Sequence, residues 1–146
     1  MPGLLTPSFK AYSSIKPNRI VAISSQTSGA GDFLVEEIGN STDQAQMIGI
    51  SDVAAKDARS DALNTNAADA GDPVTVRGAG ECCLLEMVAT CVAGALIKPN
   101  GTTDGRGTPA VLSSGGAQYY IAIALQACQN AGEFIRVQVR PGWITT

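Results

Sequence analysis

The chain has 146 residues, a formal net charge of -3, 45% hydrophobic residues and 5% aromatic residues. This length suits one domain with its own core and is too short for two ordinary domains. The acidic balance makes nucleic acid an unsuitable partner, because binding to a phosphate backbone needs a concentrated basic surface. Abundant Ala, Gly, Val and Ile favour an all-β fold. No apolar run approaches the roughly 20 residues of a membrane helix, so no membrane association is expected. No signal pattern follows Met1, so a cytoplasmic origin is expected.

The first 14 residues predict an extended arm and not part of the fold. They include prolines and glycine but show neither helical nor alternating periodicity. Disordered tails are usually poor in large apolar residues. This segment has four, which favours an arm that packs on a partner over a frayed terminus: Leu4, Leu5, Phe9 and Tyr12. The predicted organisation is therefore an arm over residues 1–14 and a β domain over residues 15–146.

Short apolar runs predict the strands of the first half. We expect strands at 19–23 and 33–38, which pair across a Ser/Gly-rich turn region, then at 47–50 and 73–76. Pro73 favours a strand start or a sheet edge, because proline cannot donate to a ladder. The Ala/Asp-rich stretch 53–69 has too thin an apolar stripe for a buried helix and is expected to be a surface loop.

The segment 81–92 fits either a strand or a helix, because Leu84, Met87, Val88 and Cys91 also form a helical stripe. Its flanking glycines favour strands. Further short strands are expected at 95–98 and 109–112.

The stretch 118–142 predicts a hairpin, since two runs of period two flank a turn at 129–132. Ile135, Val137 and Val139 share one face, while Arg136 and Arg140 share the other. On the first strand the predicted core face comprises Tyr119, Ile121, Ile123 and Leu125.

The chain also contains an internal duplication. Residues 47–50 match 120–123, an offset of 73 (47 to 120), and residues 70–76 match 131–137, an offset of 61 (70 to 131). Residues 19–22 correspond to 95–98 in the same way. We therefore predict a single-domain β-barrel or β-sandwich, tulip-like in form, built from a duplicated β unit, with an insertion in the first copy.

Nothing in the sequence indicates catalysis, and we expect that the protein is not an enzyme and has no cofactor. It contains no histidine, which removes the commonest general base and metal ligand. The four cysteines, Cys82, Cys83, Cys91 and Cys128, lack the spacing of a structural zinc site. We interpret them as reduced core thiols that bind no metal.

The order of four glycine-punctuated segments resembles the small capsid cement (decoration) proteins of tailed bacteriophages. The segments are residues 70–78, 92–98, 120–127 and 131–139, and the likeness extends from about Ile15 to Gly142. This resemblance implies an all-β domain that forms homotrimers on the outer capsid surface of a virion, bridges neighbouring major capsid subunits and stabilises the head. The adjacent Cys82 and Cys83 and the acidic insertion depart from the family pattern.

The resemblance makes the arm residues candidates for capsid binding. Candidates for trimer or capsid contacts are Tyr120, Arg136, Arg140 and Trp143. The alternative is a β-barrel binding module for a small ligand or carbohydrate, whose natural site would be Trp143 beside Tyr119 and Tyr120.

Overall fold

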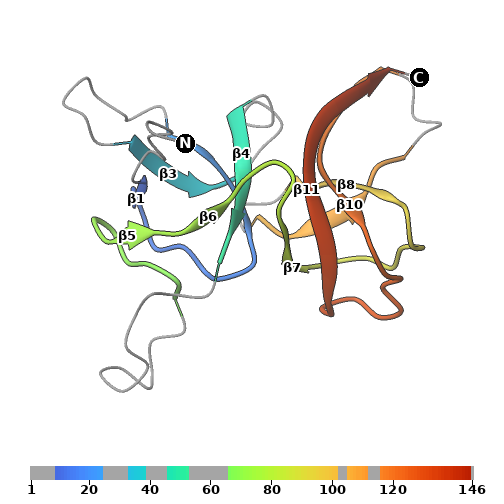
Figure 1. Cartoon of the computed structure of the whole chain (residues 1–146), viewed down its shortest axis with the longest axis horizontal. Coiled ribbons are helices and arrows are strands. Elements are labelled where there is room, and N and C mark those ends of the chain that lie inside the picture. The colour runs from blue at the N-terminus through green and yellow to red at the C-terminus, as the bar shows by residue number, and fades with distance from the viewer. Residues whose placement is uncertain are drawn as a thin grey trace, which may run out of the picture.

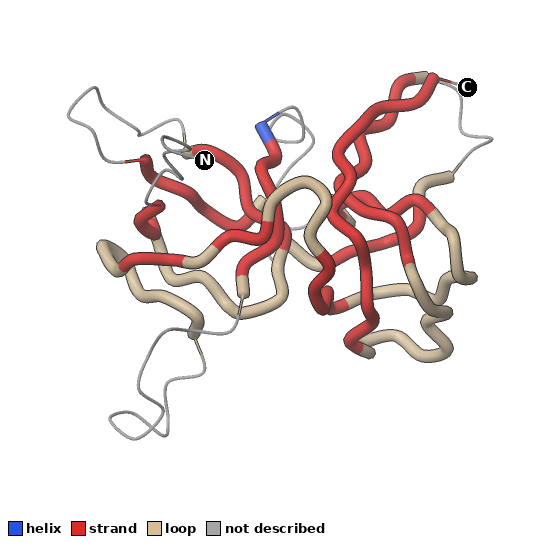
Figure 2. The backbone as a smooth tube through the Cα atoms, viewed as in Figure 1, coloured by secondary structure: helices blue, strands red, loops and turns tan. Residues whose placement is uncertain are grey.

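A computed structural model of the chain describes residues 9–24, 33–38, 46–52, 66–101, 105–111 and 116–145. Strands and loops account for almost all of these residues, which confirms the all-β prediction (Figure 2). Strands of the first half are β1 (Phe9–Ala11), β2 (Ile20–Ile23), β3 (Phe33–Glu37), β4 (Met47–Ser51), β5 (Pro73–Val74) and β6 (Val76–Arg77). Strands of the second half are β7 (Cys82–Glu86), β8 (Leu96–Pro99), β9 (Gly107–Pro109), β10 (Ala117–Ala124) and β11 (Phe134–Thr145).

The first six strands form a nearly closed barrel. Their order in the sheet is β5-β1-β3-β2-β4-β6, so the two edges are β5 and β6. These edge strands are consecutive in the chain and separated by Thr75 alone, which draws the two edges together (Figure 1). Pro73 lies on β5, at an edge of this sheet, as the sequence predicted.

The last five strands form a second sheet with the order β7-β11-β10-β8-β9. A parallel bridge between Met87, which follows β7, and Gly107 of β9 joins its two edges. This sheet therefore also curves back on itself. Figure 1 shows the two sheets side by side, with β4 next to the long β10–β11 hairpin.

The predicted duplication is confirmed at the level of strand register. We call residues 9–77 the first repeat and residues 82–145 the second repeat. The pairs of β2 with β4 and of β4 with β6 recur as the pairs of β8 with β10 and of β10 with β11. Equivalent pairs in the first repeat are Ile20–Ile50, Val21–Gly49, Ile50–Arg77 and Ser51–Val76. Those in the second repeat are Leu96–Ile123, Ile97–Ala122, Ile123–Gln138 and Ala124–Val137.

The loops of the two repeats also share their main-chain hydrogen bonds. The Gly71 amide donates to the Ala11 carbonyl at 2.8 Å, and the Gly132 amide donates to the Met87 carbonyl at 2.7 Å. Both glycines have positive φ angles, 87° and 89°, in the left-handed region that glycine adopts without steric cost. The turn chemistry that glycine permits is therefore common to the two halves.

The core extends across both repeats. One buried cluster combines residues of the first repeat, including Ile20 and Ile50, with most of the buried side chains of the second repeat, including Ile121 and Val137. A smaller cluster lies within the first repeat around Val21 and Val35. Strand β4 packs against β10 and β11, so the large cluster holds the two barrels together.

The prediction that residues 1–14 stand outside the fold is wrong for Phe9–Ala11. These residues form β1, which pairs with β3 in parallel and with β5 in antiparallel orientation. Ala11 is buried, and the ring of Phe9 contacts Phe33 edge-on with centroids 6.4 Å apart. A three-residue strand is too short to show periodicity, so its apolar residues were misread as an arm. Leu4 and Leu5 lie outside the described residues.

The predicted core face of β10 is also wrong. Ala122 and Ala124 are buried with Val137 and Val139, whereas Tyr119 and Leu125 are exposed. A small barrel has little interior volume, so alanines line its inside and the larger side chains point outwards. Ile121 stays buried because it belongs to the cluster shared with the first repeat.

Two smaller predictions also need correction. The strand expected at 109–112 begins and ends earlier, at Gly107–Pro109. Residues 53–65 lie outside the described part, but Ala67 and Ala68, at the end of the expected surface insertion, are buried. Ala68 forms an antiparallel bridge with Ile15, which explains that burial. The preference for a strand over a helix in the segment 81–92 is confirmed, because this segment contains β7.

Candidate functional site

The outer face of the second barrel carries an exposed apolar patch around one cation. Arg136 pairs with Leu84 across β7 and β11, and the Leu125 amide donates to the Arg136 carbonyl at 2.9 Å. Directly opposed residues share a face of the sheet, so these side chains form a row across three strands. Phe134, two residues from Arg136, lies on the same face and is also exposed. We call Leu84, Leu125, Phe134 and Arg136 the Arg136 patch.

A surface depression of about 320 Å³ adjoins this patch, and Arg136 and Leu84 form part of its lining together with Arg77, Asp52 and Cys82. Arg77 donates from Nε to Asp52 at 2.6 Å and from its Nη1 atom to Glu81 at 3.1 Å. The bond to Asp52, followed by the bond to Glu81, raises the pKa of Arg77. Two carboxylates thus compensate Arg77, whereas Arg136, the other cation in the lining of this depression, is exposed and accessible to a partner.

The thiols in this depression are not arranged for nucleophilic chemistry. Burial is the main cause that raises the pKa of Cys83 to about 11, so its sulfur is protonated near neutral pH, and a thiol is a far weaker nucleophile than a thiolate. Cys82 pairs with Gln138 on the outer side of the sheet and is exposed. The interpretation of all four cysteines as core thiols is therefore wrong for Cys82. Within the described ranges, no group of three or more His, Cys, Asp or Glu side chains could hold a metal ion.

A two-stranded ribbon extends beyond the second barrel. It consists of residues 117–120 of β10 and 142–145 of β11, and Figure 1 shows it reaching away from the other strands. Tyr119 lies opposite Trp143, so both rings occupy one face, where they are 39% and 61% exposed. We call these residues the aromatic ribbon.

The other face of this ribbon is anchored to the chain. Gln118 is buried there, and its amide group accepts a hydrogen bond from the Val111 amide at 3.2 Å and donates to the Val111 carbonyl at 2.5 Å. The ribbon leaves the barrel at a bulge, where Arg140 and Pro141 oppose Ile121. Proline suits a bulge because it has no amide hydrogen to donate. The anchoring holds the aromatic face towards solvent.

The predicted contact residues differ in their exposure to solvent. Arg136, Arg140 and Trp143 are exposed, as a contact role requires. Tyr120 is half-buried and packs over Gly142, where an added Cβ atom would meet the tyrosine ring. Of the predicted arm residues, Tyr12 is exposed, and Phe9 packs within the fold.

Sequence reasoning missed Leu84, Leu125 and Phe134. A signal for Phe134 was present, because it lies two residues before Arg136 and therefore had to share its solvent-facing side. The exposure of Leu84 and Leu125 depends on which face of each strand lines the barrel, and an apolar residue alone does not indicate that.

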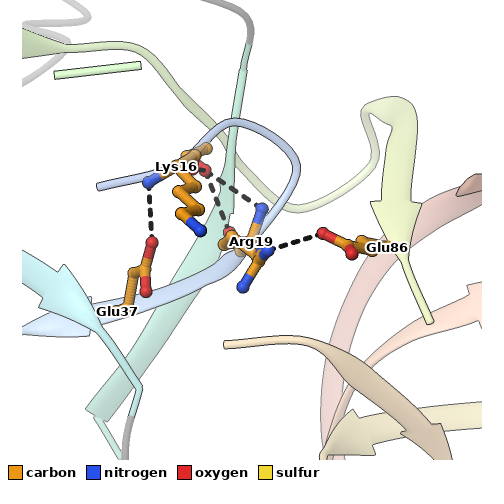
Figure 3. A network of polar contacts seen from close by, with 5 residues as sticks. Lys16, Arg19, Glu37 and Glu86 are labelled. Atoms are coloured by element: carbon orange, nitrogen blue, oxygen red, sulfur yellow. Dashed lines mark hydrogen bonds and ion pairs between the residues drawn. The ribbon is translucent and has the colours of Figure 1, made fainter. Parts of the chain in front are cut away.

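Figure 3 shows a second set of polar contacts, at the joint between the repeats. Arg19 and Glu86 form an ion pair at 2.6 Å, with side chains that are 8% and 18% exposed. The Lys16 amide donates to Glu37 at 2.6 Å, and the buried Ser51 hydroxyl donates to the Lys16 carbonyl at 2.7 Å. Of these contacts, the Arg19–Glu86 ion pair crosses between the repeats, whereas the two contacts of Lys16 lie within the first repeat. The ion pair is largely enclosed, so its role is structural and it does not form a binding surface.

No protein-family model and no curated protein matches this sequence. Among solved structures, the N base of the head fiber gp8.5 in bacteriophage phi29 has a similar fold, with a TM-score of 0.55 and 15% sequence identity. The similarity covers 90% of this chain and 90% of that chain. At this identity the match establishes a shared fold. Among the described residues there is no helix with the length and hydrophobicity needed to cross a membrane.

Proposed function

We propose that this chain is a structural protein of a bacteriophage head, and that it acts there as a cement or decoration protein on the outer capsid surface of the virion. The observation that supports this proposal best is the fold shared with the N base of a phage head fiber over 90% of both chains. Both this fold similarity and the resemblance of the sequence to capsid cement proteins concern proteins of phage heads. The proposed role is mechanical and needs no catalysis or cofactor.

The proposed partner of the Arg136 patch is the major capsid protein. Three exposed apolar side chains surround one cation, a composition typical of interfaces, where aromatic residues and Arg are enriched. A cement protein binds many equivalent positions on one shell, so each contact can be modest if one assembly holds several positions together. A patch of four side chains is adequate for such a contact.

The aromatic ribbon is the proposed contact between chains in a homotrimer. Tyr119 and Trp143 present apolar rings on a rigid two-stranded support, and burial of such rings stabilises interfaces with little loss of side-chain freedom. The number three comes from the cement-protein resemblance. Because Trp143 is the only tryptophan in the sequence, its fluorescence reports directly on burial of this surface.

The test is decoration of purified heads from the phage that encodes the chain. We expect the protein in hundreds of copies per virion by quantitative mass spectrometry, and we expect full-length protein added to undecorated heads to co-sediment with them. Arg136→Glu with Leu125→Ser should abolish this binding. Val92→Ser, at an exposed apolar position outside both surfaces, is the matched control and should bind normally. Absence of the protein from virions would reject the proposal that it is a component of the phage head. Normal binding of the double variant would reject the Arg136 patch as the contact with the capsid.

Trimer formation is tested separately by light scattering and by the emission of Trp143. We expect about three chains per particle if assembly precedes capsid binding, and emission should shift to shorter wavelength on assembly as the ring leaves water. Trp143→Ser should give monomers that keep their β-type circular dichroism. A stable dimer would contradict the proposed trimer.

Leu4 and Leu5 remain proposed capsid contacts on the basis of sequence. A chain that begins at Phe9 retains β1 and so isolates their contribution. We expect it to fold normally and to bind heads more weakly than the full chain. Unchanged binding would remove these residues from the proposal.

A second candidate function is carbohydrate binding at the aromatic ribbon. The adjacent exposed rings of Tyr119 and Trp143 suit stacking against the apolar face of a sugar ring. Titration with cell-surface polysaccharides should quench the fluorescence of Trp143 if this role exists. Quenching of the monomeric protein without any binding to heads would favour carbohydrate over capsid.

A further inference from the structure

Cys91 and Cys128 lie directly opposite each other in the second repeat. They form an isolated antiparallel bridge, in which each amide donates to the carbonyl of the other residue, at 3.0 Å from Cys91 and 2.9 Å from Cys128. Cys128 is 2% exposed and Cys91 is half-buried, and both are free thiols in this structure. The two cysteines are 37 positions apart in sequence (91 to 128), so only the fold brings them together.

The bridge places the two cysteines within disulfide range. Directly opposed residues that exchange both hydrogen bonds have Cα atoms about 5.5 Å apart, inside the range of roughly 4.4–6.8 Å seen across disulfides. Their Cβ atoms are spaced slightly more widely than a relaxed disulfide prefers. A bond at this position would therefore need a small local approach of the two segments and would carry some strain, which makes a disulfide easier to reduce.

The other two cysteines lack this geometry. Cys82 lies opposite Gln138 and Cys83 lies opposite Val137. Adjacent residues of a strand point to opposite faces, so the two thiols diverge, and their difference in exposure agrees with this. Pairing within the chain is thus specific to Cys91 and Cys128.

The first repeat shows what this position does structurally. Ile15, which corresponds to Cys91, forms a bridge with Ala68 and accepts a hydrogen bond from the Ala67 amide at 2.7 Å, and Ala67 corresponds to Cys128 at the offset of 61. All three residues are buried, and these contacts fasten the loop before β2 to the loop before β5. In the first repeat an apolar contact fastens the two loops. In the second repeat two thiols occupy the same place, where a disulfide bond can fasten the two loops.

We propose that Cys91 and Cys128 form a redox-sensitive pair that closes into an intrachain disulfide when the protein meets a low-molecular-weight disulfide such as oxidised glutathione. The more accessible Cys91, as a thiolate, attacks one sulfur of oxidised glutathione and releases one glutathione thiolate. Cys128 then loses its proton to solvent and attacks the Cys91 sulfur of the mixed disulfide, which releases the second glutathione. Two cysteine thiols are oxidised and one glutathione disulfide is reduced.

The contacts of the thiols set this order of attack. Cys128 is buried, and its Sγ donates to the Asn130 carbonyl at 3.2 Å. Burial is the first cause that raises the pKa of Cys128, followed by the proximity of Cys91. Cys128 is therefore the resolving thiol and Cys91 the entry point. The closed loop contains β8, β9 and β10, so the bond would fix the barrel that carries both proposed contact surfaces.

The test exposes the native full-length chain to excess oxidised glutathione, then blocks remaining thiols by alkylation and maps the peptides by mass spectrometry. We expect one crosslinked pair, Cys91 with Cys128, whereas Cys82 and Cys83 each carry either the alkyl group or a glutathione and form no crosslink. The oxidised protein should melt roughly 5–10 °C higher than the reduced protein, since a crosslink restricts the unfolded chain. Millimolar reduced glutathione should reopen the bond.

Two variants make the result decisive. Cys82→Ser with Cys83→Ser keeps the pair and should still form the bond. Cys128→Ala introduces the residue that the first repeat uses at this place, so it should fold, but it should show no increase in melting temperature on oxidation. Four alkylated thiols in the native protein, a dimer linked through Cys82, or crosslinking only after unfolding would each overturn the proposal.

Discussion

The two repeats make the same main-chain bonds with different side chains. At the equivalent parallel contact of each repeat, Ala11 lies beside Val35 in the first repeat, whereas Met87 lies beside Gly107 in the second. The large and the small residue have exchanged sides while the backbone arrangement is retained. The shared bonds therefore define the fold, and the side chains that fill it can be redistributed.

The repeats differ most in the length of two strands, which are longer in the second repeat. β10 and β11 span 8 and 12 residues, whereas β4 spans 5 and the equivalents of β11 are two strands of 2 residues each. The additional length of β10 and β11 forms the aromatic ribbon. The proposed contact surfaces thus occur in the repeat that departs from the minimal barrel, and the first repeat serves as its structural reference.

Removal of β1 is the most severe test of the equivalence between repeats. β1 corresponds to β7, and its loss would expose the edges of both β3 and β5, which it joins. We expect a chain that begins at Ile15 to lose its cooperative thermal transition, while a chain that begins at Phe9 melts like the full protein. Circular dichroism melting measures both. If the chain from Ile15 melts like the full protein, β1 does not contribute to the stability of the fold in the way expected of a strand equivalent to β7.

Exchange of the side chains at the parallel contact should reproduce the first repeat within the second. A Cβ atom at Gly107 would lie 2.7 Å from Ile97 Cγ2 and 2.9 Å from Met87 Sδ, so Gly107→Val alone should destabilise the protein by about 3 kcal/mol through overpacking. Met87→Ala alone should cost a similar amount, about 3 kcal/mol, through a cavity. Urea denaturation measures both changes.

The double variant Met87→Ala with Gly107→Val is the informative one. It copies Ala11 and Val35, so the two changes should compensate and the double variant should be more stable than either single variant. Additive losses would show that the barrels differ in shape and not only in how they distribute side-chain volume.

The ion pair at the joint tests how the repeats differ in charge. Arg19 and Glu86 are largely buried, and their equivalents in the other repeat are Ala95 and Lys10. Glu86→Ala leaves the Arg19 charge without this carboxylate and should cost about 2 kcal/mol, whereas Arg19→Leu with Glu86→Leu should cost less, because apolar residues can replace a buried pair. Glu81→Ala, which removes an exposed partner of Arg77, is the control and should cost under about 0.5 kcal/mol.

Most of the strand positions could be predicted from the sequence, because the duplication constrained them. The match of residues 19–22 with 95–98 located β2 and β8, and the predicted pairings of β2 with β3 and of β10 with β11 are confirmed. The pairings of β2 with β4 and of β8 with β10 were not predicted. The same alignment places Phe9 on Leu85 and Ala11 on Met87, so β1 was detectable by extending the repeat to the N-terminal side. Without that extension, the three residues of β1, within the stretch between Pro7 and the Ser13–Ser14 pair, carry no periodic signal of their own.

The candidate site was harder to predict than the fold. Arg136 and Arg140 stood out because charged residues in an alternating strand must face solvent. The assignment of β10 failed because apolar alternation shows that two faces differ but not which one lines a narrow barrel. The Arg19–Glu86 contact depends on how the two barrels pack, and no local pattern encodes it.

Acid titration gives the smallest expected effect and compares the two turns. Glu133 accepts hydrogen bonds from the Asn130 side chain at 2.8 Å and the Gln129 amide at 3.1 Å, and the bond from the Asn130 side chain is the first cause that lowers the pKa of Glu133. At the equivalent turn, Asp69 occupies the place of Asn130. A lowered pKa stabilises the fold above the unfolded value and loses this contribution as the pH falls through the folded value.

We therefore expect the Glu133 carboxyl to titrate below its ordinary value of 4.5 in an NMR titration. Asn130→Ala should move this midpoint upwards and should slightly reduce the loss of stability below that pH. A midpoint in the original protein at or above the ordinary value would show that the turn bond does not persist in solution.

The joint between the repeats joins unlike surfaces. The Glu86 amide donates to the Asn18 carbonyl at 3.1 Å, and the Ile20 amide donates to the Gly105 carbonyl at 2.7 Å. The first repeat thus contributes the segment before β2, and the second contributes the end of β7 and the start of β9. Such a head-to-tail contact differs from a two-fold contact in that each repeat retains a second surface of the other kind.

Repeated between molecules, head-to-tail contacts produce rings or open-ended fibres. The retained surfaces here include Gly94 and Phe33, which are both exposed. Lys10 and Ala95 stand where the internal joint has Glu86 and Arg19, so the ion pair of that joint cannot be copied from one chain to the next. A head-to-tail contact between two molecules through these surfaces therefore lacks the buried ion pair of the internal joint.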